Sequence, residues 1–448
     1  MRSKRPLSNS SRGHYPTRRD FLKQTGATLL AGSSFAQIVH AAVLGKNGFT
    51  PPSERITVGF IGVGKMGKGH VGSFLEDKTV QIVAICDVER GRRESQVKRV
   101  EEHYAEQRRA GTYRGCASYV HFVEMLTQEK MDGVVIVTPP HWHALMCCEA
   151  ARAGCDIYCE KPLTRCIDEG KAIIRSVRCF GRVFQTGSQQ RSDEAFRRAC
   201  EIVRNGRIGE IKEIFVNVGG PPQEDDLPPE PTPEGLDWDL WLGPCMYRPY
   251  SSVLAPPESY EGWPRFRYYR DYDGGGMTDF GAHHFDIAQW GIGTDDTGPV
   301  EIYPPDGKEF KTLTYVYANG IRMYHGGGHP AAAVEFVGTR GRVRVNRGQY
   351  LETEPAYLKD DPIGADEVHL YRSNNHKDNW LQCMRTRRDP ICTAEIGHRT
   401  ATICHIGNIA YWLKRPLKWD PVREEFVGDP AANRLRMRAF RSPWQLPV

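Results

Sequence analysis

The sequence predicts an α/β domain with a parallel sheet, followed by an α+β domain with an antiparallel sheet. In the first half of the 448-residue chain, apolar runs of strand length alternate with helical stretches, and parallel strands need such helical crossovers. In the second half, short connections such as 318–320 join strand candidates, which is typical of antiparallel hairpins. The length suits two or three domains, and 40% hydrophobic with 26% charged residues suits a soluble globular protein.

The first 41 residues predict a twin-arginine signal peptide. They carry seven basic residues and one acidic residue, whereas the rest of the chain is nearly neutral and gives no electrostatic reason to expect a nucleic-acid partner. Residues 17–23 (TRRDFLK) resemble the twin-arginine motif, and a weakly apolar stretch follows. The alternatives are a membrane anchor and a disordered basic tail. We therefore expect the twin-arginine export machinery as a partner, a periplasmic or otherwise exported protein, and a linker over residues 42–54.

The first expected strand, residues 56–61, leads directly into a glycine-rich turn and a helix that extends to about Leu75. The turn reads Gly62-Val63-Gly64-Lys65-Met66-Gly67, which is G-x-G-x-x-G in the context that dinucleotide binding requires. The first glycine permits the tight turn, the second lets the backbone approach the pyrophosphate, and the third lets helix and strand pack closely. The free N–H groups of the helix N-terminus, from Lys65 and Met66 onward, then face the phosphates.

The second expected strand, residues 81–86, ends at Asp87, where a carboxylate is expected to bind the adenosine ribose hydroxyls. A carboxylate there would repel a 2′-phosphate, so Asp87 favours NAD over NADP. Arg90 leaves NADP open, because an arginine at that place can receive the extra phosphate. Alternatively, Arg90 is a solvated residue of the charged helix expected from Glu89 to about Arg109.

The alternation continues with further expected strands and helices. Strands are expected over 133–137, 155–159 and 183–186, and helices over 141–153 and 167–180. Ligands of such sheets bind outside the carboxyl ends of the strands. The residues expected together at these ends are Asp87, Thr138, Pro139 and Lys161.

The second half predicts a sheet and a helix that carries an acid and two histidines. Strands are expected over 212–218, 311–317, 321–325, 332–337 and 343–345, and helices over 278–290, 375–385 and 394–414. Asp279 and His283 are four residues apart on the helix that Gly291 should end, so they share one face and suit proton transfer. A surface Asp–His pair is the alternative. Spacing does not decide whether His283 or His284 faces the site, and Asp286 could orient the His283 ring.

These motifs together resemble the glucose–fructose oxidoreductase / inositol dehydrogenase (Gfo/Idh/MocA) family over most of residues 55–420. The motifs that carry the resemblance are the glycine-rich turn, Thr138-Pro139-Pro140-x-x-His143, Glu160-Lys161-Pro162 and Asp279-x-Gly281-x-His283. The resemblance implies a Rossmann domain (55–187) and a substrate and oligomerisation domain (188–448), an α+β domain with an open, mostly antiparallel sheet. It also implies a homo-oligomer.

The resemblance implies roles for individual residues. Lys161 would be the catalytic lysine, completed by Asp279 and His283. Thr138, Pro139, Glu160 and His143 would join the cofactor-binding residues. Independently of the resemblance, a partly desolvated lysine near the positive charge of the cofactor can exchange protons near neutral pH. A surface ion pair of Lys161 with Glu160 is the alternative.

Three functions follow from these residues. The first is an NAD(P)-dependent oxidoreductase that acts on a CH–OH group of a sugar or polyol, with a cofactor that stays tightly bound. The second is a glycosidase or lyase that oxidises a glycoside transiently, and the third is a non-catalytic NAD-binding protein. No metal site is expected. A carbohydrate could be contacted by Arg191, Trp263, Arg265 and Tyr268.

Overall fold

A computed structural model describes Pro51 and residues 54–446. The export signal predicted for residues 1–41, and the linker apart from Pro51 and Glu54, lie outside the described residues. The first half forms a six-stranded parallel sheet of order β3-β2-β1-β4-β5-β6, the order of dinucleotide-binding Rossmann domains. The strands are β1 (Ile56–Ile61), β2 (Val80–Cys86), β3 (Ala117–Tyr119), β4 (Gly133–Ile136), β5 (Asp156–Cys159) and β6 (Phe184–Thr186).

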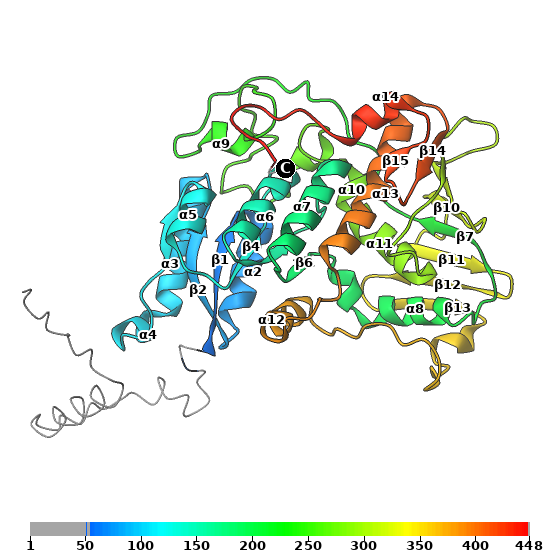
Figure 1. Ribbon diagram of the computed structural model, residues 1–448, viewed down its shortest axis with the longest axis horizontal. Helices are drawn as coiled ribbons and strands as arrows, with labels where there is room; N and C mark the ends of the chain where they lie inside the picture. The colour runs from blue at the N-terminus through cyan, green and yellow to red at the C-terminus, as the bar shows by residue number, and fades with distance from the viewer. Residues whose placement is uncertain (1–50, 52–53, 447–448) are drawn as a thin grey trace, which may run out of the picture. The chain divides into compact units, whose positions relative to one another are not determined.

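The helices of the first half connect these strands, as the sequence predicted (Figure 1). The expected helix from Glu89 to Arg109 is divided at Tyr104, whose ring is buried against the sheet. The sequence reading missed β3 and the helix that follows it, because both are short and lack a clear period. The helices are α2 (Lys65–Leu75), α3 (Arg90–His103), α4 (Ala105–Arg109), α5 (Phe122–Gln128), α6 (His143–Arg152) and α7 (Ile167–Cys179).

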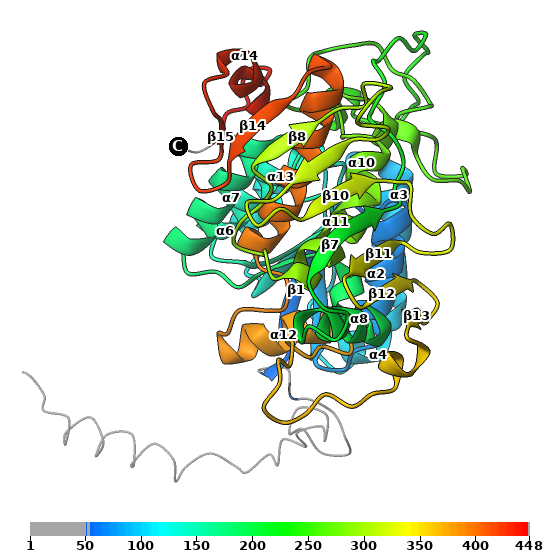
Figure 2. The same ribbon diagram turned by 90° about the vertical axis from the view of Figure 1, so that its right-hand side faces the viewer.

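The second half forms a nine-stranded sheet of order β13-β12-β11-β7-β10-β9-β8-β14-β15, whose face is turned to the viewer in Figure 2. All paired neighbours for which a register is defined run antiparallel except β7 and β10, so the predicted mostly antiparallel sheet is confirmed. The strands are β7 (Ile211–Val216), β8 (Glu301–Tyr303), β9 (Thr314–Val316), β10 (Arg322–His325), β11 (Val334–Gly338), β12 (Gly341–Asn346), β13 (Tyr350–Glu354), β14 (Leu417–Asp420) and β15 (Glu425–Phe426).

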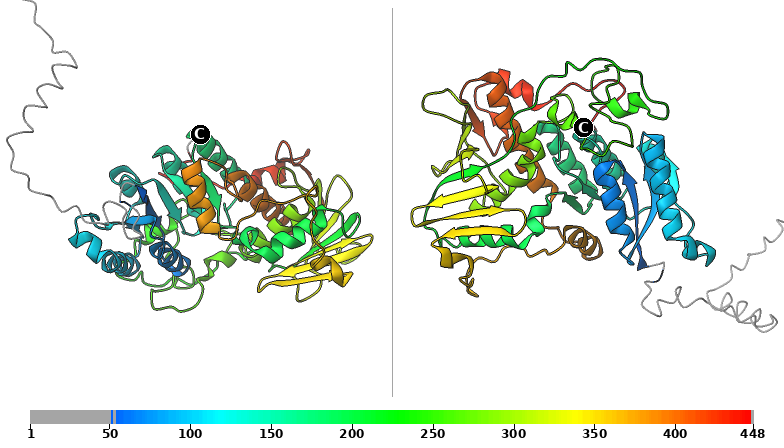
Figure 3. Two further views of the ribbon diagram at one scale, coloured as in Figure 1. Left: turned by 90° about the horizontal axis from the view of Figure 1, so that it is seen from below. Right: turned by 180° about the vertical axis from the view of Figure 1, so that it is seen from behind.

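Helices lie between the two sheets (Figures 1 and 3). The long helix α13 packs against α7 of the first half on one side and against α11 on the other, and α11 packs on β7 and β11. The helices of the second half are α8 (Glu194–Arg204), α9 (Trp238–Leu242), α10 (Gly276–Asp279), α11 (Gly281–Ile292), α12 (His376–Thr386), α13 (Ala394–Leu413) and α14 (Pro430–Asn433).

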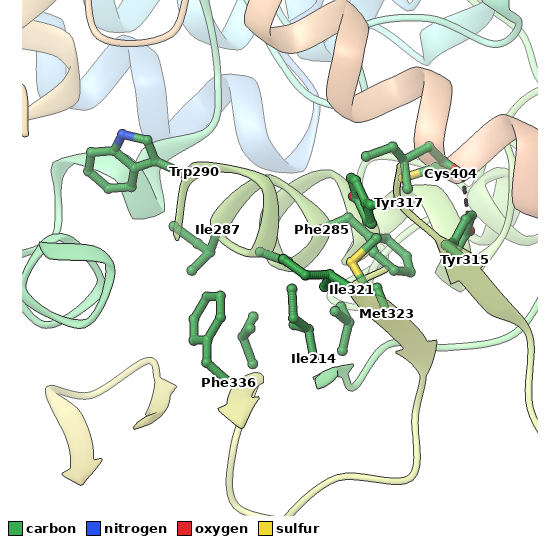
Figure 4. Close-up of a cluster of buried hydrophobic side chains, with 14 of the residues drawn as sticks. Ile214, Phe285, Ile287, Trp290, Tyr315, Tyr317, Ile321, Met323, Phe336 and Cys404 are labelled. Carbon is green, nitrogen blue, oxygen red and sulfur yellow. Dashed lines mark hydrogen bonds between the residues drawn. The ribbon is translucent and has the colours of Figure 1, made fainter. Parts of the chain in front are cut away.

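The larger hydrophobic core fixes α11 on the nine-stranded sheet. Figure 4 shows Phe285 and Ile287 of α11 facing Ile214, Met323 and Phe336 of the strands, and all five side chains are fully buried. Burying side chains of this size contributes about 1.5–3 kcal/mol each. This packing sets the orientation of α11, and with it the direction in which His283 points.

The predicted end of this helix at Gly291 was wrong by two residues. Gly293 ends α11 with a left-handed backbone, φ 74°, the conformation that favours glycine. Gly291 lies inside the helix, where an added Cβ would come within 2.5 Å of the Phe336 ring. Its small size therefore serves close packing and not helix termination.

All thirteen cysteines lie in the described part of the chain, where they are unpaired and eleven are buried. This agrees with the interpretation of the cysteines as small core residues. Among the described helices, none is both long and apolar enough to cross a membrane.

Candidate active site

A cavity of about 980 Å³ lies along the carboxyl ends of the parallel strands. Its volume is at the upper end of the range for ligand pockets, about 300–1,000 Å³. The lining comes from the glycine-rich turn, the ends of β2, β4 and β5, the segment 254–268, the start of α11 and the turn after β12. Both halves of the chain therefore build one site.

The glycine-rich turn has the shape that a dinucleotide needs. Gly62 has φ +84°, and a Cβ on Gly67 would lie 2.3 Å from the Gly62 carbonyl oxygen. At Gly64, by contrast, a Cβ would meet only the tip of Arg92, at 3.5 Å. Gly64 is the N-cap of α2 without a side-chain hydrogen bond, so the first N–H groups of the helix remain available to an anion. These features fit a bound pyrophosphate.

The end of β2 presents two carboxylates to the cavity. Asp87 accepts hydrogen bonds from the Val63 and Glu89 N–H groups, at 2.8 and 2.9 Å. Burial raises the pKa of Asp87, and these two backbone bonds oppose the rise. Glu89 also lines the cavity. Each carboxylate oxygen can accept a further bond, as ribose hydroxyls would require.

Arg90 does not reach this end of the cavity. Its guanidinium is half exposed and lies 3.8 Å from Glu234, and it is absent from the lining. Arg92, which the sequence analysis did not single out, lines the cavity and donates to the Pro256 carbonyl oxygen. An arginine that could meet a 2′-phosphate is therefore Arg92, tied to the opposite wall, and not Arg90.

Residues 254–263, which we call the covering segment, close the cavity over the glycine-rich turn. Lys65 donates to the Glu261 carbonyl oxygen, and Lys68 forms an ion pair with Glu258 at 3.1 Å. Lys65 also lies 5.9 Å from the centre of the Trp263 ring. A dinucleotide bound in the cavity could leave past the covering segment only if these contacts broke.

Lys161 and Asp279 form the centre of the opposite end. The Lys161 ammonium donates to the Asp279 carboxylate and to the Asp279 backbone carbonyl, both at 2.7 Å. Although burial favours a higher pKa for Asp279, the charges of Lys161 and Arg267 lower it below its ordinary value. The carboxylate is therefore ionised near neutral pH and holds the lysine nitrogen in place.

The expected continuous helix over 278–290 is divided between Asp279 and His283, and the break serves this contact. The His283 N–H donates to the Phe280 carbonyl, at 2.9 Å, instead of to the Asp279 carbonyl four residues earlier. The Asp279 carbonyl is thereby free to accept from Lys161. Helical spacing alone predicted the two residues on one face, but not this second bond.

The structure decides between the two histidines. His283 lines the cavity, and its Nδ1 has no hydrogen-bond partner among the described residues. Burial and the nearby charges of Lys161 and Arg347 lower the pKa of His283 far below its ordinary value, so the ring is neutral. His284 instead uses Nδ1 to contact the Asn217 carbonyl, at 2.8 Å, away from the cavity lining.

Asp286 does not orient the His283 ring, contrary to the sequence-based suggestion. Its two oxygens accept from Arg191 at 2.7 and 2.8 Å. Arg191 is fully buried and also pairs with Asp295. Arg191 is therefore a structural residue, and it is not available to a carbohydrate.

A second carboxyl group, Asp273, faces the Lys161 end of the cavity. Its Oδ1 accepts from the Gly274 N–H and the Thr278 hydroxyl, at 2.7 and 2.6 Å. Its Oδ2 forms no hydrogen bond to a described residue. Burial raises the pKa of Asp273 to about 6, and the charge of Asp279 contributes to the rise. Asp273 is not among the residues that the sequence motifs predicted for the site.

Of the predicted site residues, eleven line the cavity and three do not. The three that do not are Gly67, which packs behind the turn, Arg90 and His143. The His143 ring nitrogens lie 2.9 and 3.0 Å from the Thr138 and Pro162 carbonyl oxygens. His143 therefore links the two loops that position Thr138 and Lys161. The eleven lining residues are Gly62, Gly64, Lys65, Met66, Asp87, Thr138, Pro139, Glu160, Lys161, Asp279 and His283.

Glu160 is held apart from Lys161 by partners of its own. Its carboxylate lies 2.8 Å from His70 Nε2 and accepts from the Gln189 amide at 2.7 Å. Burial opposes ionisation of Glu160, but His70 and Lys161 lower its pKa below the ordinary value. The described residues contain no group of three or more His, Cys, Asp or Glu residues that could hold a metal ion.

The fold and the glycine-rich turn define a dinucleotide-binding Rossmann architecture joined to a second domain with a mostly antiparallel sheet. Residues 56–188 match the oxidoreductase family NAD-binding Rossmann fold, and residues 215–446 match the oxidoreductase family C-terminal alpha/beta domain. The chain belongs to the Gfo/Idh/MocA oxidoreductase family.

Individual relatives differ in what they match. The uncharacterized oxidoreductase YrbE of Bacillus subtilis is 23% identical over 372 residues, which cover 78% of this chain and 93% of the relative. An alpha-N-acetylgalactosaminidase of Shewanella oneidensis is 32% identical, but over only 36% of this chain and 37% of its own length. The aldose-aldose oxidoreductase of Caulobacter crescentus has the same fold, with a TM-score of 0.55, 16% identity and coverage of 81% and 99%.

Proposed function

We propose that the protein is an oxidoreductase that moves a hydride between a CH–OH carbon of a sugar or polyol and NAD, with Lys161 as the acid/base. The nicotinamide cofactor, when bound, supplies the hydride acceptor or donor. The single observation that carries the proposal is the position of Lys161. Its nitrogen donates to the Asp279 carboxylate, in the cavity that the glycine-rich turn also lines.

The residues of this end divide the work of proton transfer. Oxidation of an alcohol releases the hydroxyl proton, and Lys161 is the group placed to accept it. Asp279 orients the lysine nitrogen through two contacts. His283 is neutral and offers a ring nitrogen to the cavity, so it can hydrogen-bond the reacting oxygen without adding charge.

The acidic end of the cavity supports NAD over NADP. Asp87 and Glu89 both line the region where the adenosine ribose is expected, and two carboxylates disfavour a 2′-phosphate. The contacts of Lys65 and Lys68 with the covering segment support slow release of the cofactor. A retained cofactor would be reset by a second substrate during each catalytic cycle.

Transient oxidation of a glycoside, followed by cleavage, is a second candidate function, and Asp273 is the observation in its favour. Such cleavage needs a base for the C–H next to the new ketone in addition to Lys161. The Asp273 carboxyl has one free oxygen toward the cavity. Net cleavage of a glycoside without accumulation of NADH would favour this candidate. A non-catalytic NAD-binding role would leave the arrangement of Lys161 and Asp279 without a purpose.

Export and assembly are part of the proposal. Arg18 and Arg19 within the basic leader support export by the twin-arginine machinery to the periplasm. The resemblance to the family supports a homo-oligomer. Fractionation of cells that express the chain, compared with an Arg18→Lys/Arg19→Lys variant, tests export, and light scattering of the purified protein tests assembly.

The direct test is to identify the bound nucleotide and then to remove the lysine. Denaturation of the natively purified protein should release NAD, which mass spectrometry identifies. Oxidation of sugars and polyols is then screened by the absorbance of NADH. Lys161→Met should keep the nucleotide and lose turnover by about 10²- to 10⁴-fold. The exposed Lys418 on β14 provides the matched control, Lys418→Met. Absence of any nucleotide, with no binding of added NAD or NADP, would refute the proposed function.

A further inference from the structure

Two arginines at the Lys161 end of the cavity carry positive charge that the protein neutralises only in part. The first is Arg267, whose guanidinium lies 5.1 Å from the Trp263 ring and 5.7 Å from the Phe266 ring. Its closest acidic contact is Asp279 Oδ2, at 3.4 Å, and Lys161 already occupies the other oxygen of that carboxylate. The Arg267 Nε is buried and has no hydrogen-bond partner among the described residues.

The second is Arg347, in the turn between β12 and β13. Its guanidinium lies 5.2 Å from the centre of the ring of Phe280, the residue that follows Asp279 in the chain. Arg347 also lines the cavity. Within the described part of the chain, no carboxylate lies within ion-pair distance of Arg347. Burial lowers the pKa of Arg347, opposed by the charge of Asp279. Arg347 remains exposed to solvent beside the reacting groups.

Three arginines with little-exposed side chains are fully paired with acids in this protein. Arg191 contacts two carboxylates, Arg344 contacts three, and Arg165 contacts Glu169. A desolvated charge without a partner is costly. Arg267 shares its single carboxylate with Lys161 and Arg347 has none within ion-pair distance in the described part of the chain, so an anionic ligand in the cavity would complete their pairing.

Apart from Asp279, the described carboxylates that line this end of the cavity form no ion pair with either arginine. Asp193 lines the cavity, but its Oδ1 caps α8 and its Oδ2 accepts from the Gln349 amide. Asp273 directs one oxygen to Gly274 and Thr278. The positive charge is therefore left for a ligand.

We propose that the substrate is an anionic sugar or polyol, and that its carboxylate or phosphate binds between Arg267 and Arg347 while its CH–OH group lies at Lys161. Guanidinium groups suit this task, because their planar set of donors matches carboxylate and phosphate oxygens. Aromatic rings on both arginines hold the guanidinium planes in place. This inference rests on the proposed function and narrows its substrate class.

The test compares each neutral sugar with its charged forms. Glucose, glucuronate and glucose 6-phosphate, and the corresponding galactose set, are titrated calorimetrically into the protein as purified and assayed for oxidation. We expect binding and kcat/KM at least about tenfold better for one charged form, since charged hydrogen bonds contribute roughly 1.5–3 kcal/mol. Preference for the uronate identifies a carboxylate ligand, and preference for the phosphate ester identifies a phosphate ligand.

Arg347→Gln separates the role of the charge from a general effect on the site. It should weaken binding of the preferred charged sugar by about 10- to 100-fold and weaken binding of the neutral sugar much less. The matched control is Arg342→Gln on β12, the strand that leads to Arg347, since Arg342 pairs with Glu335 and Glu354 and does not line the cavity. Arg342→Gln should bind both sugars as the natural protein does.

Three results would overturn the inference. They are oxidation of neutral sugars with no preference for charged ones, an equal loss for both in Arg347→Gln, and no binding of any charged member of the panel. In the first two cases the oxidoreductase function stands. A protein without nucleotide refutes the proposed function separately, and calorimetry with the charged sugars still decides the anion site.

Discussion

Replacing Asp273 with asparagine should change the pH dependence of stability. Burial raises the pKa of Asp273 to about 6 from the ordinary value of 3.8. At Asp273 the folded protein therefore holds more protons than the unfolded chain between these values, so the contribution of Asp273 to stability is most favourable below about pH 4 and falls as the pH rises to about 6. The difference of roughly 2 pKa units corresponds to about 3 kcal/mol.

Asparagine retains an oxygen that can accept from the Gly274 N–H and the Thr278 hydroxyl, so the local structure should persist. The free energy of unfolding of the variant, relative to that of the natural protein, should increase by up to about 3 kcal/mol as the pH increases from 4 to 8. Denaturation midpoints across this range, at saturating NAD, provide the measurement. Asp366→Asn, which removes an exposed carboxylate, is the control. A difference between variant and natural protein that is the same at every pH would refute the reasoning.

Three further predictions concern the cofactor end and the core. Gly64→Ala should leave the thermal midpoint unchanged but abolish NAD binding in calorimetry, whereas Gly67→Ala should lower both, because its Cβ would meet the Gly62 carbonyl at 2.3 Å. Arg191→Met should lower the free energy of unfolding by about 3–5 kcal/mol in a denaturant titration, since it leaves buried carboxylates unpaired. Lys68→Gln should accelerate NAD release about two- to fivefold in stopped-flow experiments, the range for an exposed ion pair.

The Rossmann half could be predicted because its signals are local. Each glycine of the turn, the strand before it and Asp87 lie within about thirty residues, and each has one physical reason to be there. The two short elements between Ala117 and Gln128 escaped detection because three to seven residues carry too little periodicity. Arg90 was named for the cavity and Arg92 was not, because sequence distance does not show which side chain of a helix faces the cavity.

Residues at the substrate end of the cavity could be predicted from the sequence only where they belong to a motif. Lys161 and Asp279 were found through motifs, but the break at Phe280 was not, because the chain there has good helical spacing. Arg347 had no local signal. It lies in a hairpin turn among several arginines, and only the register of the nine-stranded sheet brings it to the cavity.

The arrangement of charge at Lys161 limits which mechanism the site can use. His283 is neutral, and Asp279 is ionised and occupied by Lys161 and Arg267. Of the three residues predicted to act together, the lysine is therefore the one to which the proposed function assigns the proton transfer. Asp273 is the one neighbouring group in the described lining of this end whose raised pKa lies near neutrality. A reaction that needs two proton transfers would require Asp273, whereas simple oxidation would not. The activity of Asp273→Asn on an alcohol and on a glycoside thus separates the two candidate functions.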